Sequence, residues 1–89
     1  MKLKPFKIQV NPEQSEYVQK CVFAHGGEWF KKDMGTTVHD TDKPYLTYGS
    51  IMNPDKYYLL FSSIEHKQTF DENKAPEITF GKFKELYGI

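Results

Sequence analysis

Cys21 and His25 are the residue pair best suited to chemistry, since a thiol and an imidazole can act as nucleophile and base or as metal ligands. They lie four residues apart in a segment with helical periodicity, so they share one face of the predicted helix. The same stripe carries Val18 and Val22, which are expected to face the core. No second cysteine and no closely spaced histidine supplies further ligands. We therefore predict structural roles, with Cys21 buried and His25 at the C-terminal end of the helix, where the helix dipole suits it.

The segment from His39 to Asp42 places one imidazole and two carboxylates in a predicted loop, and His66 lies elsewhere in the chain. Calcium loops need oxygen ligands at fixed spacing, with a central glycine and a terminal glutamate, and this loop lacks both. Zinc sites usually have three or four nitrogen or sulfur ligands. We predict an acidic loop with an incidental histidine and no metal site.

Signatures of an enzyme are also missing from the sequence. Glu65, Glu72 and Glu77 lie in segments that we interpret as exposed, so paired carboxylates for hydrolysis are not indicated. The glycines follow the long predicted helix, whereas a phosphate-binding glycine loop precedes one. We predict a non-enzymatic protein with no catalytic residues and no cofactor.

Aromatic residues next to lysines are the remaining functional signal, in the runs Trp29 to Lys32 and Lys56 to Tyr58. Such rings can stack on single-stranded bases while lysines attract the phosphate backbone. The same residue types can form a protein-binding patch, in which Trp and Tyr are preferred anchors. The candidate partner-binding residues are Trp29, Lys56, Tyr57 and Tyr58.

The charge balance favours a protein partner over a nucleic acid. Twelve basic residues, all of them lysine, and twelve acidic residues give a formal net charge of zero. Arginine dominates specific base contacts, and a basic field draws nucleic acid to a protein. The glycine-flanked aromatic motif of the RNA-binding sheet fold is missing as well. A weak binder of single-stranded nucleic acid or of a nucleotide is therefore the alternative function.

The chain of 89 residues is expected to form a single domain, residues 1–89. Aromatic residues make up 16% of the chain, and each buried ring removes roughly 150–250 Å² from water, so one core can form without a disulfide. The single cysteine and the lack of a secretory signal indicate a reducing cytoplasm. No apolar run approaches the ~18 residues of a membrane-spanning helix, so no membrane contact is expected.

The first half of the chain predicts a strand and a long helix. Alternating apolar residues indicate a strand at Phe6–Val10. Asn11-Pro12 is typical of a helix start, with Gln14 placed as a capping-box partner. Gly26 can adopt the left-handed conformation that ends a helix.

A second strand is expected at about Glu28–Lys31, directly after the helix. Trp29 falls where this strand meets the helix. We interpret Trp29 mainly as a structural wedge, with ligand stacking or partner anchoring as the alternative role.

The second half of the chain predicts shorter elements separated by polar loops. They comprise a loop at Lys31–Asp42 with a short strand at Thr36–Val38, a strand at Tyr45–Tyr48, a turn at Asn53–Asp55, a central strand at Lys56–Ser63, a polar turn at Asp71–Pro76, and a helix at Phe80–Tyr87 capped by Thr79 and ended by Gly88. The expected fold is α+β: a single-layer, mostly antiparallel sheet of about 4–5 strands, packed by one long helix and a short C-terminal helix.

The strand at Lys56–Ser63 is apolar on both faces. Tyr57, Leu59 and Phe61 point to one side, while Tyr58 and Leu60 point to the other. Because only two helices are expected, one of these faces should stay partly exposed. Exposed apolar patches mark contacts with other proteins or with a second copy of the chain.

The run IQVNPEQSEYVQKCVFAHGGEW, the segment PYLTY and the closing run EITFGKFKEL resemble a group of small bacteriophage proteins of mostly unknown function. The resemblance covers most of the chain and concerns a folding motif, so it carries no functional residues. It implies a phage accessory protein that acts on a host protein in the bacterial cytoplasm, in takeover of host machinery or in counter-defence. The matching positions are Val18, Gln19, Phe23, Gly26, Trp29, Tyr45, Leu46, Ile78 and Thr79.

Overall fold

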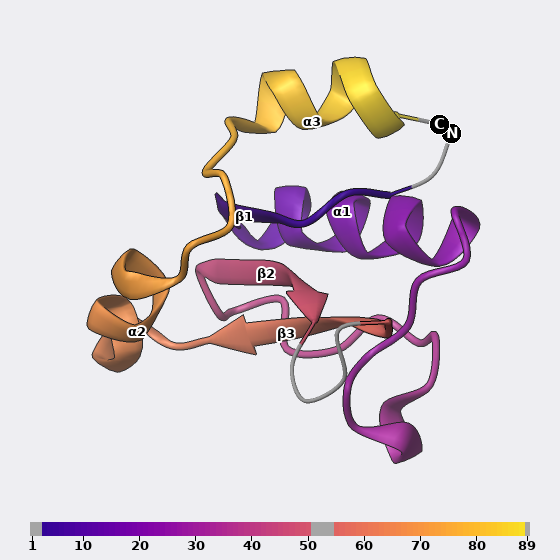
Figure 1. The fold of residues 1–89 in the computed structure, drawn as a ribbon, viewed down its shortest axis with the longest axis horizontal. Coiled ribbons are helices and arrows are strands. Elements are labelled where there is room, and N and C mark those ends of the chain that lie inside the picture. Colours follow the sequence, from indigo (N-terminus) through magenta and orange to yellow (C-terminus); the bar gives the residue numbers. More distant parts are fainter. Residues whose placement is uncertain (1–2, 51–54, 89) are drawn as a thin grey trace.

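The structure is a computed structural model that describes residues 3–50 and 55–88. Its antiparallel sheet has three strands in the order β1-β2-β3, namely β1 (Phe6–Gln9), β2 (Tyr45–Ser50) and β3 (Tyr57–Ser62). The described residues also form the helices α1 (Pro12–Ala24), α2 (Lys67–Glu72) and α3 (Phe80–Tyr87) and the short 3₁₀ helices η1 (Lys32–Met34) and η2 (Ile64–His66). The α+β class with an antiparallel sheet is confirmed (Figure 1).

The prediction of about 4–5 strands was wrong, because the described part of the sheet has three. The segment expected as a strand at Glu28–Lys31 contributes one bridge, between Trp29 and Leu59, and no strand forms at Thr36–Val38. After Phe30 the chain turns into η1, and the Trp29 N–H bonds to the carbonyl of Gly35 at 3.1 Å instead of extending a ladder. A second single bridge joins Lys7 of β1 to Glu77 at the opposite edge.

Strand β3 lies at an edge of the sheet, whereas a central strand was predicted at Lys56–Ser63. The central strand is β2, which pairs with both neighbours. Two apolar faces suggested a central position, but only one of them faces the core here. Of the predicted turn before this strand, Asp55 lies in a turn, and positions 53 and 54 lie outside the described residues.

Helices α1 and α3 begin and end where their local sequences predicted. Asn11 accepts a hydrogen bond from the Gln14 N–H at 2.8 Å, and the Gln14 side chain accepts one from the Asn11 N–H at 3.1 Å, which completes the capping box. Gly26, with φ 90°, follows the C-cap of α1. The Thr79 hydroxyl accepts from the Lys82 N–H at 3.0 Å and caps α3, which ends at Gly88.

The core lies between one face of the sheet and the helices α1 and α3, which pass side by side across it (Figure 1). Phe6 of β1 contacts the rings of Phe83 and Tyr87, with centroid distances of 5.4 and 6.3 Å. The residues that the sheet and α1 contribute to this apolar core are Phe6, Ile8, Leu46, Tyr48, Leu59, Val18, Cys21 and Val22.

Helix α2 was not predicted; the polar turn expected at Asp71–Pro76 begins inside it. Its N-cap, His66, makes no side-chain capping bond, and Phe70 is its one buried residue, so the local sequence carries little helical signal. The position of α2 depends on distant residues. Phe70 stacks on Tyr45 of β2 at 4.6 Å, and the buried Lys7 amine donates to the Phe70 carbonyl at 2.8 Å. Figure 1 shows α2 at one end of strands β2 and β3.

Candidate protein-binding surface on strand β3

The sheet face opposite α1 and α3 carries a partly exposed apolar patch. Because side chains alternate along a strand, Tyr58 and Leu60 of β3 point to this outer face together with Thr47 of β2, which pairs with Leu60. All three are half-buried. Phe30 comes from the chain beside β3, and its ring meets that of Tyr58 edge to face at 5.5 Å. We call Phe30, Thr47, Tyr58 and Leu60 the outer-face patch.

Helix α2 covers a different part of the outer face. It packs near Tyr45, at the end of β2 where the Lys7 and Phe70 side chains also lie. Phe30, by contrast, keeps 36% of its surface exposed. An aromatic pair with one partly solvated ring is the feature of this face that is suited to a partner.

The structure separates the candidate partner-binding residues of β3. Tyr57 and Tyr58 point to opposite faces: Tyr57 meets the ring of Tyr48 on the core side at 6.0 Å and is 36% exposed. Lys56 is exposed just before the strand. Burial raises the pKa of the Tyr48 hydroxyl, and the neighbouring Tyr57 adds to that rise. Tyr58 alone of these candidates belongs to the outer-face patch.

Trp29 is buried, with 2% of its surface exposed. Its ring lies between Phe23 of α1 and Phe61 of β3, at centroid distances of 6.3 and 5.6 Å, and both contacts are edge to face. The indole N–H donates to the carbonyl of Thr37 at 2.8 Å. Trp29 therefore holds helix, strand and loop together and offers no ring face to solvent.

Next to Trp29 is a small apolar notch at the edge of β3, with a volume of about 210 Å³. We call it the Trp29 notch, and its lining residues are Trp29, Lys31, Met34, Leu59, Leu60 and Phe61. Leu60 belongs to both the notch and the outer-face patch. The sequence analysis placed Phe30 in the aromatic run at Trp29 to Lys32 and Leu60 on one of the two apolar strand faces, without naming either as a partner-binding residue, and it did not consider Met34. The period-two alternation places Leu60 beside Tyr58, whereas no local signal identifies Met34.

The residues considered for catalysis or metal binding occupy structural positions. Cys21 is fully buried, and the His25 ring nitrogen Nε2 lies 3.1 Å from the carbonyl of Tyr87. The backbone of His39 is bound by the buried side chain of Gln19. Within residues 3–50 and 55–88, no group of three His, Cys, Asp or Glu side chains is placed to hold a metal ion.

Ser63 and His66 form a pair that the sequence analysis did not single out, with 3.0 Å between Oγ and Nδ1. Nucleophilic catalysis needs a base that is oriented by a third group. Among the described residues, the His66 ring donates no hydrogen bond to a carboxylate, and the Ser63–His66 pair is exposed. The pair therefore lacks the third group that would orient His66 as a base.

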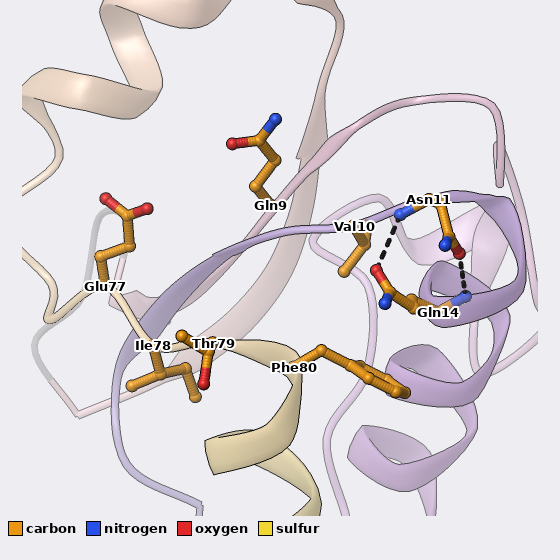
Figure 2. Close-up of a pocket in the computed structure, with 8 residues that line it drawn as sticks. All are labelled: Gln9, Val10, Asn11, Gln14, Glu77, Ile78, Thr79 and Phe80. Carbon is orange, nitrogen blue, oxygen red and sulfur yellow. Dashed lines mark hydrogen bonds between the residues drawn. The ribbon is translucent and has the colours of Figure 1, made fainter.

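Figure 2 shows a cleft of about 680 Å³ between the start of α1 and the segment that leads into α3. Its polar groups serve the fold: Asn11 and Gln14 bond to each other, and Thr79 caps α3. The Glu77 carboxylate points away from Asn11 and Gln14 (Figure 2). This cleft gathers no convergent set of polar side chains.

Comparisons with family models, with curated proteins and with solved structures find no match to this chain. In the described segments, no helix has both the length and the apolar character needed to cross a membrane.

Proposed function

We propose that this protein is a non-enzymatic binding module that holds a protein partner against the outer-face patch. The observation that carries the proposal is the edge-to-face pair of Phe30 and Tyr58, beside Leu60 on the sheet face opposite α1 and α3. Tyrosine suits such a surface because its ring buries apolar area while its hydroxyl stays hydrated. Aromatic anchors ringed by polar residues are typical of the energetic centre of protein interfaces.

A weak single-stranded nucleic-acid or nucleotide binder is the second candidate. Exposed Lys31 follows Phe30, and exposed Lys56 lies two residues before Tyr58, so cations flank the aromatic pair. The net charge of zero and the lack of arginine weaken this candidate, because little long-range field draws a polyanion to the surface.

The resemblance to small bacteriophage proteins supports a more specific form of the proposal. In that form the partner is a host protein, and the module acts in the bacterial cytoplasm during takeover or counter-defence. Self-association through the same patch is the competing form, because a second copy of the chain carries the same apolar surface.

Affinity capture from a bacterial lysate, with the bound proteins identified by mass spectrometry, tests the proposal. The tagged protein is compared with Tyr58→Glu and with the matched control Tyr57→Glu, which places the same charge on the opposite face of β3. We expect a partner that is recovered with the parent chain and with Tyr57→Glu but is lost with Tyr58→Glu.

Equal recovery with both folded variants would exclude the outer-face patch as the interface. Size-exclusion chromatography with light scattering identifies self-association by a dimer that Tyr58→Glu dissociates. Fluorescence anisotropy with a labelled oligothymidine tests the second candidate, and binding that Tyr58→Glu removes would favour nucleic acid over protein.

A further inference from the structure

The Trp29 notch has the size and lining of a pocket for one apolar side chain. An apolar cavity of ~150 Å³ holds a benzene molecule, and the notch measures about 210 Å³. Trp29 and Leu59 form a buried base, while Met34, Leu60 and Phe61 are half-buried around it. Methionine adapts its shape to different side chains, so Met34 suits the wall of such a pocket.

Unpaired backbone groups of β3 lie beside the notch. Leu59 uses its N–H and C=O at the outer edge of β3, bonding to the Glu28 carbonyl at 2.9 Å and to the Phe30 N–H at 3.1 Å. Hydrogen-bonding groups of a strand point to the same edge at every second residue. The N–H and C=O of Phe61 therefore point to that edge too, beyond the point where the chain leaves it for η1. Among the described residues, no backbone hydrogen bond from a loop or from an isolated bridge involves these two groups of Phe61.

The charge at the notch is positive. Lys31 is the one charged residue in its lining, and none of the ion pairs among the described residues includes it. Asp33 is exposed on η1 and does not line the notch. A segment that places a carboxylate near Lys31 complements this charge.

We propose that the edge of β3 at Phe61 binds an extended, acidic peptide segment of a protein partner, with one large apolar side chain in the Trp29 notch. This inference rests on the proposed function and names the kind of segment that is bound. The bound residue pairs antiparallel with Phe61, so each donates its N–H to the carbonyl of the other. Opposed residues point to the same face, which places the bound side chain beside the Phe61 ring, over the notch.

A defined probe tests this geometry: the acetylated, amidated pentapeptide Glu-Thr-Glu-Thr-Leu. Because the Glu28–Phe30 segment already occupies the edge at Leu59, the peptide extends only from the N-terminal side of its leucine. Its glutamates lie two and four positions from the leucine and so share its face, the face on which Lys31 lines the notch. Titration into the isotope-labelled full chain is followed by amide NMR. We expect saturable shifts at the Phe61 amide and at the Trp29 indole.

Three altered peptides test separately the apolar contact, the backbone hydrogen bonds and the charge interaction with Lys31. Serine in place of leucine should weaken binding at least about tenfold, because the apolar contact is lost. N-methylation of the leucine removes one hydrogen-bond donor and should weaken binding by about threefold to tenfold. Lysines in place of both glutamates should weaken binding by about twofold to fivefold.

On the protein, Lys31→Glu should reverse the preference between the glutamate and lysine peptides. The matched control is Lys32→Glu, which makes the same charge change at the next residue, outside the notch lining. We expect Lys32→Glu to retain the preference of the parent chain. Amide spectra of both variants without peptide establish that each is folded.

Several results would overturn the inference. One is the absence of a saturable shift at the Phe61 amide, and another is equal binding of the N-methylated and unmodified peptides. A third is the appearance of the same Phe61 shifts when the protein alone is concentrated, because a second copy of the chain would then occupy the edge of β3. The proposed function stands or falls separately on Tyr58→Glu, because Tyr58 lies outside the notch. If a partner is lost with Tyr58→Glu but no peptide binds at Phe61, the proposed binding module stands, whereas the binding of a peptide strand to the edge of β3 is excluded.

Discussion

The side-chain amide of Gln19 binds the backbone of His39 through two hydrogen bonds of 2.8 Å, one from Nε2 to the His39 carbonyl and one from the His39 N–H to Oε1. Gln19 is fully buried in α1, and its Nε2 also donates to the Ser15 hydroxyl at 3.0 Å. These bonds fix the loop after η1 against α1. The same loop supplies the Thr37 carbonyl that accepts the Trp29 indole N–H. The position of Trp29 therefore depends partly on Gln19.

Gln19→Leu should destabilise the protein by about 2 kcal/mol, because partly buried N–H and C=O groups of His39 lose their partners. Urea unfolding followed by circular dichroism measures the change. Lys20→Leu, at the exposed neighbouring position with one surface ion pair to Glu16, is the control and should change stability by less than about 1 kcal/mol. An unchanged unfolding midpoint for Gln19→Leu would contradict the loop attachment.

Local signals in the sequence were sufficient for the long elements. The start of α1 depends on Asn11, Pro12 and Gln14, which interact within one turn of helix, and the start of α3 depends on Thr79 in the same way. Short-range rules therefore located both helices. The burial of Cys21 followed from the same helical periodicity.

Features that depend on distant contacts could not be predicted from the sequence. Helix α2 is placed by Lys7 and Tyr45, which lie far from Phe70 in the chain. The edge position of β3 was hidden because the strand is apolar on both faces. Its outer-face ring Tyr58 packs against Phe30, which lies far away in the chain. Met34 reaches the notch only because η1 turns the chain back beside β3.

Lys7→Met should loosen α2 while leaving most of the fold intact. Lys7 is buried, with 7% of its surface exposed, and its amine donates to the carbonyls of Phe70 and Asp71 at 2.8 and 3.1 Å. Methionine keeps the apolar stem over the Phe70 ring but removes both donors. Faster hydrogen exchange is expected at the α2 amides, with slight change in α1.

Lys67→Met is the matched control for α2. Lys67 is on the same helix and forms an exposed ion pair with Asp71 that contributes little to stability. Its replacement should leave exchange in α2 nearly unchanged. Equal acceleration in both variants would show that the Lys7 bonds do not hold the helix.

Alkaline pH should destabilise the protein partly through Tyr48. Burial raises the pKa of the Tyr48 hydroxyl above its ordinary value of 10.0, and Tyr57 and Glu28 add smaller contributions. The fold favours the protonated form, so this contribution to stability is present below pH 10 and is lost as the pH rises through the folded-state pKa.

In Tyr48→Phe the decline of unfolding free energy above pH 10 should be shallower than in the parent chain. Urea titrations on both sides of that pH measure the two slopes. Identical slopes for Tyr48→Phe and the parent chain would rule out a contribution from Tyr48.

Trp29 should be far more important to the fold than its neighbour Phe30. Trp29→Ala empties a site between Phe23 and Phe61, and such a change destabilises by ~3–5 kcal/mol. A domain of 89 residues at the low end of the usual ~5–15 kcal/mol of total stability would retain almost none of it, so this variant should be largely unfolded.

Trp29→Phe and Phe30→Ala separate packing from the indole hydrogen bond and from surface effects. Trp29→Phe keeps an aromatic ring but leaves the Thr37 carbonyl without its donor, so a folded protein weakened by about 1–3 kcal/mol is expected. Phe30 is 36% exposed, and its removal should lower stability much less than Trp29→Ala does. Thermal unfolding followed by circular dichroism measures all three variants. A cooperative, scarcely shifted transition for Trp29→Ala would mean that Trp29 is not the wedge between α1 and β3. Trp29 would then not provide a rigid base for the Trp29 notch.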